Sequence, residues 1–178
     1  MVGRLELAPA LERPDLLAPP VAAFLSHWSR AGEVQVAPID PDLADTEAFC
    51  AAYDVDLAQS ANCVVVAGKR GEQLRLAACL VLATTRADVN GVVRRRLDAR
   101  KASFAPLEQT VGATGMEYGG ITPLGLPAGW PVLVDPAVAA AGQVVVGSGL
   151  RRSKLVLPGA ALADLPGAEV LSGLGREL

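Results

Sequence analysis

A glycine- and proline-rich segment in the second half of the chain is the first candidate for chemistry. Residues 115–131 contain five glycines and three prolines, and Gly119 and Gly120 are adjacent. Glycine lets the backbone approach a ligand closely and leaves N–H groups available to bind it. The segment lacks the Gly-Lys-Ser/Thr of a phosphate-binding loop and the strand–helix setting of a dinucleotide fingerprint. It is therefore either the wall of a small-ligand pocket or a surface crossover in which glycine and proline only form turns.

Three further candidates stand at the ends of apolar runs. Asn62 and Cys63 begin one such run, and Asp135 follows another. A buried asparagine needs hydrogen-bond partners, so Asn62 serves either a ligand or the neighbouring backbone. Asp135 could bind an amine or a hydroxyl, or it could cap a helix that begins at Pro136. Cys63 is by default a small residue of the core.

Histidine and cysteine usage excludes several kinds of site. The chain has one histidine, His27, and three cysteines without metal-ligand spacing. A histidine-rich zinc site, a Ser-His-Asp triad and a disulfide framework are therefore not expected, and no metal or cofactor is predicted.

Apolar residues make up 51% of the chain, yet no stretch reads as a membrane span. Charge-free runs such as residues 76–85 are far shorter than the roughly 20 residues that a spanning helix needs. Acidic residues interrupt the N-terminal region where a signal peptide would be apolar. The sequence predicts a cytoplasmic protein without membrane contact.

Basic residues are clustered although the formal net charge is −3. One cluster is Arg94-Arg95-Arg96 with Arg100-Lys101, and the other is Arg151-Arg152 with Lys154. Each cluster is either a solvated face or a contact for the phosphates of a nucleic acid.

Apolar periodicity and turn residues predict a mixture of helices and strands. Helices are expected at residues 21–30, 42–53, 88–97, 106–112, 136–141 and 158–165. Strands are expected at residues 34–38, 63–67, 74–85, 101–105, 132–134, 144–147, 154–157 and 169–171. Because a polar turn with glycine separates the strands at 63–67 and 74–85, they should form a hairpin. We predict one α+β domain with a mixed sheet at residues 32–178, preceded by an N-terminal arm and helix at residues 1–31.

The order of these motifs resembles the YbaK/ProX family of prolyl-tRNA editing domains. The similarity spans residues 32–172, and its components are Asn62-Cys63-Val64-Val65-Val66, Asp88, Thr114-Gly115, residues 119–125, residues 132–135 and Val146-Gly147-Ser148-Gly149. The most specific part is the Gly-Gly-x-x-Pro-x-Gly sequence of residues 119–125, followed by a strand and Asp135.

The resemblance implies a partly barrel-like mixed sheet wrapped by helices and an activity that hydrolyses the ester of a mischarged tRNA without a metal. Typical substrates would be Cys-tRNA(Pro) and Ala-tRNA(Pro). The catalytic positions would be Asn62, Gly119 and Gly120. The substrate-binding positions would be Cys63, Thr122, Pro123, Gly125, Asp135, Ser148 and Gly149. The contacts to tRNA phosphates would come from Arg95, Arg96, Arg151 and Arg152.

Asn62 stands where the family has a characteristic lysine, and asparagine carries no charge. Three alternative functions are compatible with an asparagine at this position. The first is a trans-acting deacylase in which Asn62 orients the ribose or the water through hydrogen bonds. The second is a non-catalytic relative that binds tRNA or an aminoacyl-tRNA synthetase. The third is a small-molecule-binding domain. The salt dependence of binding affinity separates the second function from the third, because only a tRNA binder loses affinity steeply as the salt concentration rises.

Overall fold

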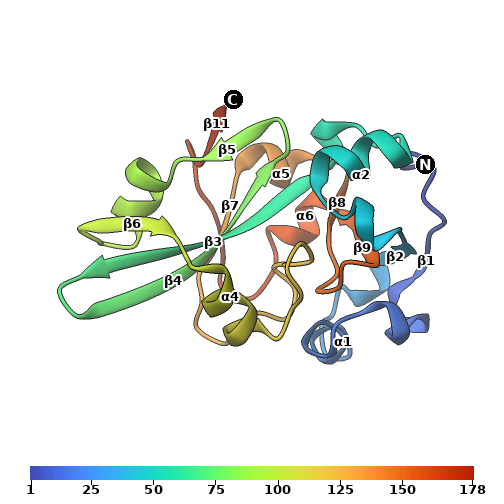
Figure 1. Ribbon diagram of the computed structural model, residues 1–178, viewed down its shortest axis with the longest axis horizontal. Helices are drawn as coiled ribbons and strands as arrows, with labels where there is room; N and C mark the ends of the chain where they lie inside the picture. The colour runs from blue at the N-terminus through green and yellow to red at the C-terminus, as the bar shows by residue number, and fades with distance from the viewer.

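The strands of the computed structural model, which describes residues 1–178, form two principal sheets and one short ladder. The strands are β1 (Ala8–Pro9), β2 (Gln35–Pro38), β3 (Ala61–Arg70), β4 (Gln73–Leu82), β5 (Thr85–Ala87), β6 (Lys101–Phe104), β7 (Val132–Val134), β8 (Gln143–Gly147), β9 (Ser153–Pro158), β10 (Ala168–Val170) and β11 (Gly175–Glu177). The sheet orders are β10-β7-β4-β3-β6 and β1-β2-β9-β8, and β11 pairs with β5 (Figure 1). The first sheet mixes parallel and antiparallel pairs, which confirms the predicted mixed α+β class.

The helices are short and surround the two sheets. They are α1 (Pro19–Leu25), α2 (Thr46–Tyr53), α3 (Arg94–Arg96), α4 (Leu107–Thr114), α5 (Pro136–Ala140) and α6 (Gly159–Leu162). None of the helices has the length and the apolar character that crossing a membrane requires.

Several predicted helix boundaries were wrong, and side-chain caps explain two of them. The Asp40 side chain accepts from the N–H of Asp42, so the chain makes a 3-10 turn before α2 begins at Thr46. The Asp88 carboxylate accepts from the N–H of Val92, and a π turn precedes α3. The first helix ends at Leu25 instead of residue 30, and α4 continues to Thr114.

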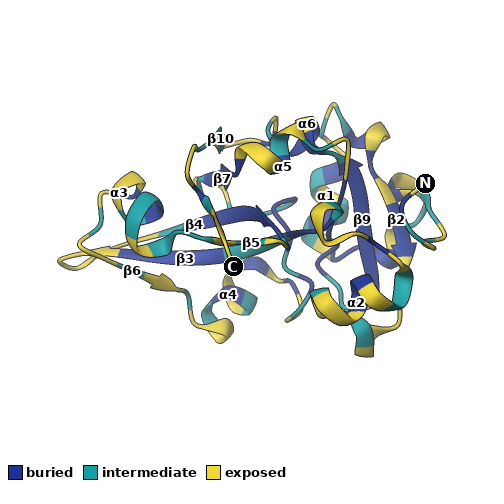
Figure 2. Ribbon diagram, turned by 90° about the horizontal axis from the view of Figure 1, so that it is seen from above, coloured by how far each residue is buried: buried dark blue, intermediate teal, exposed yellow.

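The predicted hairpin is confirmed as β3 and β4, which pair over ten residues from Ala61↔Leu82 to Arg70↔Gln73. Gly71 has a φ of +60° in the turn, a conformation that glycine adopts without strain. Figure 1 shows the hairpin reaching away from the four-stranded sheet, and Figure 2 shows that its tip is exposed while β4 is buried nearer the centre. The β3–β4 hairpin therefore runs from the interior of the molecule to its surface.

The two sheets meet at the start of β3, where Ser60 forms a parallel bridge with Val145 of β8. From there β8 and β9 form an antiparallel pair that is buried along nearly all its length. The junction leaves the start of β3 beside β8, and this end of the strand carries Asn62.

Residues 1–31 share the main core with the rest of the chain. Val21 and Leu25 of α1 are buried in a cluster that also contains Leu80 and Leu155 from the two sheets. The short strand β1 pairs with β2 at the edge of the four-stranded sheet. The N-terminal segment therefore contributes to the packing of the domain.

Candidate functional site

A cleft of about 390 Å³ opens where the two sheets meet. Its floor comes from the start of β3 and from β8, and its sides come from the turn before α2, the residues around the start of α4, and the loop at 118–121. Twelve of its 20 lining residues are hydrophobic, and the polar ones include Thr46, Asn62 and Lys154. A mostly apolar cleft with a few converging polar groups is the usual form of a small-ligand site.

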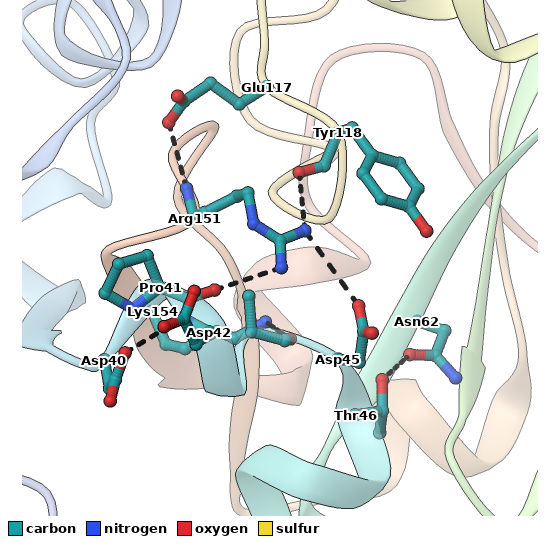
Figure 3. Close-up of polar contacts among 11 residues, drawn as sticks. Asp40, Pro41, Asp42, Asp45, Thr46, Asn62, Glu117, Tyr118, Arg151 and Lys154 are labelled. Atoms are coloured by element: carbon teal, nitrogen blue, oxygen red, sulfur yellow. Dashed lines mark hydrogen bonds and ion pairs between the residues drawn. The ribbon is translucent and has the colours of Figure 1, made fainter.

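Asn62 is oriented by the first residue of α2. The Thr46 hydroxyl donates to Asn62 Oδ1 over 2.6 Å, as Figure 3 shows. The amide oxygen is therefore occupied, and the Nδ2 group has no hydrogen bond within the protein and remains a donor for a ligand in the cleft. Asn62 lies where the sequence predicted a site residue, and Thr46 is a partner that the sequence did not suggest.

Lys154 is a buried cation in the same cleft. Its residue surface is only 8% exposed, and its Nζ donates to the carbonyl oxygen of Ala44 over 3.0 Å. The ammonium also lies 5.3 Å from the centre of the Phe49 ring. No carboxylate forms an ion pair with it, and burial lowers the pKa of Lys154 below that of an exposed lysine. An ammonium has three donor hydrogens, so this one has capacity left for a ligand.

Cys63 follows Asn62 in the floor of the cleft. Burial raises the pKa of its thiol, with a smaller contribution from Cys79, so the group stays protonated at neutral pH. A neutral thiol is a poor nucleophile. Cys63 therefore shapes the cleft as a small apolar residue.

The loop that faces β3 across the cleft presents backbone donors. Gly119 has a φ of +78°, and a side chain at this position would collide with the Arg151 guanidinium. Gly119 and Ile121 line the cleft, and their N–H groups make no hydrogen bond within the protein. Gly120 between them is buried against the backbone of Leu150, which fixes the loop close to β8. The cleft is therefore bordered by two backbone donors without partners.

Arg151 ties the rim of the cleft together. Its guanidinium donates to the carbonyl oxygens of Tyr118 and Pro41 over 3.2 Å and 3.0 Å, and it lies 4.0 Å from the Asp45 carboxylate. Figure 3 shows Asp45 between this guanidinium and the pair of Thr46 and Asn62. The Asp45 side chain is 71% exposed, so its carboxylate is open to a ligand at the mouth of the cleft.

The other predicted pocket residues lie behind or beside the cleft. The Asp135 carboxylate accepts from the N–H groups of Ala137 and Gly175, so it caps α5 and ties β11 to the sheet. The Ser148 hydroxyl is bonded to Ser153, and Gly149 packs against Ala18. Pro123 and Gly125 line a separate hollow, and Thr122 is buried without lining the cleft. Of the predicted pocket residues, the cleft thus brings together Asn62, Cys63 and Gly119.

The four arginines predicted to contact tRNA do not form one surface. Arg96 pairs with Glu169 over 2.5 Å, and Arg152 donates to the carbonyl oxygen of Asp15. Arg151 belongs to the rim of the cleft, and Arg95 is exposed on α3. Lys154, which the sequence placed in the same basic cluster as Arg151 and Arg152, lies in the cleft itself.

The sequence model of the aminoacyl-tRNA editing domain family matches residues 40–165. The chain therefore belongs to the aminoacyl-tRNA editing domain family, a YbaK-type family. No curated protein matches the sequence.

Solved structures reproduce the fold. A candidate trans-editing enzyme for prolyl tRNA synthetase superposes with a TM-score of 0.75 at 21% identity, covering 90% of this chain and 97% of the other. The hypothetical protein APE2540 also gives a TM-score of 0.75, at 17% identity over 88% of this chain and 99% of the other. A scaffold protein used for computational epitope grafting gives the same score at 20% identity, covering 90% and 97%.

Proposed function

We propose that the protein is a trans-acting aminoacyl-tRNA deacylase that hydrolyses the ester of small mischarged amino acids, such as Cys-tRNA(Pro) or Ala-tRNA(Pro). The observation that carries this proposal is the convergence of Asn62, Lys154 and the free N–H groups of the loop at 118–121 in one cleft. Membership of the editing family supports the substrate class.

In the proposed reaction a water molecule attacks the carbonyl carbon of the aminoacyl ester. A bond forms from the water oxygen to that carbon, and the carbonyl oxygen becomes an oxyanion. The oxyanion then collapses to a carbonyl group, the bond to the terminal ribose oxygen breaks, and the ribose oxygen takes the proton that the attacking water gives up, so that free amino acid and tRNA leave. Because an aminoacyl ester is already activated, positioning and oxyanion stabilisation supply the catalysis that is needed.

Three kinds of donor border the space for the oxyanion. The amide of Asn62 and the N–H groups of Gly119 and Ile121 are neutral donors, and the Lys154 ammonium adds a positive charge. Charge–dipole and charge–charge attraction are strong here because much of the cleft is apolar. Lys154 therefore supplies a cation although residue 62 is an asparagine.

The mouth and the walls of the cleft suit a small amino acid. The exposed Asp45 carboxylate can accept hydrogen bonds from the α-ammonium group of the substrate. Cys63 and Val65 in the floor and Ile121 at the side are apolar, and the volume of about 390 Å³ limits the side chain that enters. A second pocket of restricted size gives the discrimination that a synthetase cannot reach by binding alone, since one methylene is worth about 1–3 kcal/mol.

The test is release of labelled amino acid from a panel of mischarged tRNAs that includes Cys-tRNA(Pro) and Ala-tRNA(Pro), with and without chelator. We expect release that survives chelation and falls about tenfold or more in Asn62→Ala. Gly120→Val, which would force the loop away from Leu150, should also lower the rate. The proposal fails if no panel member is hydrolysed, or if both variants release amino acid at the wild-type rate.

A result without hydrolysis would favour the non-catalytic alternative, in which the protein binds tRNA or a synthetase. Affinity for uncharged tRNA, measured against salt, then separates that alternative from a small-molecule-binding domain.

A further inference from the structure

A second hollow, of about 630 Å³, lies at the exposed end of the β3–β4 hairpin. We call it the basic hollow. It is lined by Ala67, Lys69, Asn90, Arg94, Arg100, Lys101, Ala102 and Ser103. Figure 2 shows α3 and β6, which contribute to it, together at this end of the molecule.

The basic hollow contains four cations and no carboxylate. Arg13, Arg30, Arg70, Arg96, Arg151 and Arg176 form all the ion pairs of the protein, so none involves Lys69, Arg94, Arg100 or Lys101. This concentration of unpaired positive charge occurs in a chain whose formal net charge is −3. An uncompensated group of cations attracts a polyanion even where the whole molecule does not.

Two of the cations face each other directly. Lys69 of β3 and Lys101 of β6 are partners in the antiparallel register, and like charges in this arrangement destabilise a sheet. Arg94 is held in place by the bond from its Nε to the carbonyl oxygen of Asn90, over 2.9 Å. Binding of an anion would relieve the repulsion between the lysines, which is the behaviour expected of a phosphate site.

The basic hollow and the cleft share no lining residue, but both are lined by residues of β3 and β6. Phe104 lines the cleft and Lys101 lines the basic hollow, three residues apart on β6 and so about 10 Å between Cα atoms. On β3, Cys63 and Lys69 lie on the same face, six residues apart. An RNA whose 3′ end occupies the cleft would therefore meet these cations as it leaves.

We propose that the basic hollow binds backbone phosphates of the RNA whose aminoacylated 3′ end enters the cleft. The proposal rests on the proposed function for its substrate. Arg94, Arg100 and Lys101 belong to the first basic cluster of the sequence, and the fold adds Lys69 from β3, whereas Arg95, Arg96, Arg151 and Arg152 do not line the basic hollow.

Charged residues on an edge strand also prevent the strands of different molecules from pairing, and β6 is an edge strand. Protection of the edge needs charge of either sign, whereas phosphate binding needs positive charge. Protection of the edge also has no effect on tRNA affinity, so a loss of tRNA affinity in a variant without these lysine charges distinguishes the two roles.

The experiment measures binding of uncharged tRNA by fluorescence anisotropy over a series of salt concentrations. The test variant is Lys69→Gln/Lys101→Gln. The matched control is Arg13→Gln/Arg86→Gln, which removes the same charge from one half-buried and one exposed residue, neither of which lines the basic hollow. We expect the test variant to lose at least tenfold in affinity and to reduce the slope of log affinity against log salt by about one to two, with the control close to wild type.

A second measurement uses the deacylation assay. With mischarged tRNA, the test variant should raise KM while kcat changes little. With an aminoacyl-adenosine, which has no backbone phosphates, the variant and the wild type should react alike.

The two proposals can fail separately. If the wild type hydrolyses mischarged tRNA and the test variant keeps its KM and its salt slope, the basic hollow does not bind phosphate and its charges only protect β6. If the wild type hydrolyses nothing but binds tRNA through Lys69 and Lys101, the phosphate site stands and the deacylase proposal falls. Wild-type protein that binds no tRNA at low salt overturns the phosphate site.

Discussion

The cleft and the basic hollow use positive charge in opposite ways. In the cleft one ammonium, that of Lys154, is 8% exposed and is held by a carbonyl oxygen and an aromatic ring. In the basic hollow, Lys69, Arg100 and Lys101 are exposed and have no ion-pair partner. A buried cation acts at short range and is little affected by salt, whereas exposed cations act at longer range and are screened. The buried ammonium of the cleft suits stabilisation of charge on one reacting group. The exposed cations of the basic hollow suit attraction of a charged polymer.

The largest expected effect comes from the cation of the cleft. Lys154→Met keeps a side chain of similar length and removes the charge, so kcat/KM for deacylation should fall about 100-fold, the usual effect of losing an oxyanion donor. The affinity for uncharged tRNA should not change. Stability to urea should stay the same or rise by about 1 kcal/mol, because a buried charge is lost.

The control for this variant places a lysine at the other side of the cleft. Adding Asn62→Lys to Lys154→Met returns an ammonium to the same space and should restore at least tenfold of the activity. Wild-type activity in Lys154→Met would show that the Lys154 cation takes no part in deacylation. The proposed difference in the use of positive charge between the cleft and the basic hollow would then be wrong.

The pH dependence of the same pair sharpens the comparison. Burial lowers the pKa of Lys154, so its ammonium loses its proton at a lower pH than an exposed lysine does. The ratio of wild-type to Lys154→Met rates should be greatest at pH values below this lowered pKa. The ratio should decline as the pH rises through the lowered pKa, which lies below the ordinary value of 10.5. A ratio that is still unchanged when the pH has risen beyond 10.5 would contradict the role assigned to the charge.

A smaller effect is expected at the hydroxyl that orients Asn62. Thr46→Val removes the 2.6 Å hydrogen bond to Asn62 Oδ1, so the amide is free to rotate. The loss of one such bond is worth about 1 kcal/mol, which corresponds to about a fivefold fall in kcat/KM. Thr46→Ser keeps the hydroxyl and should retain most of the activity. Equal losses in the two variants would mean that the hydroxyl is not what matters at residue 46.

The smallest effect concerns the stability of the basic hollow. Lys101→Gln removes the repulsion with Lys69 across the strands and should raise the free energy of unfolding by about 0.5 kcal/mol in low salt. The gain should shrink at 0.5 M NaCl because salt screens exposed charges. Urea denaturation at the two salt concentrations measures it. A stability loss in low salt would show that Lys101 is paired favourably and that the lysines do not repel each other.

The sequence predicted the main hairpin well because β-branched and apolar residues fill both strands and a glycine turn separates them. It placed Asn62 and Gly119 in a common site through the resemblance to the editing family. It missed Lys154, since a lysine next to two arginines suggests a solvated face. The run Leu155-Val156-Leu157 after it was a usable signal, because a strand that is apolar on both faces lies inside the protein, and all three residues are buried.

Asp135 shows why other residues could not be assigned from the sequence. An aspartate between a strand and a proline fits both a ligand and a helix cap, and the structure has it capping α5. Its second partner, the N–H of Gly175, is 40 residues away in the chain. Long-range contacts of this kind depend on the packing of the whole domain. Local patterns do not contain them.

Strand β3 fixes the separation of the two regions. Cys63 in the cleft and Lys69 in the basic hollow are six residues apart, about 20 Å between their Cα atoms. Pairing with β4 over ten residues holds this spacing, since a slip of one residue would turn every side chain to the opposite face. If both regions bind one RNA, β3 sets the distance between the two contacts on that RNA. Only an RNA in which the acyl group and the phosphates are separated by this distance would fill both regions. The protein would then recognise the RNA independently of the amino acid attached to it.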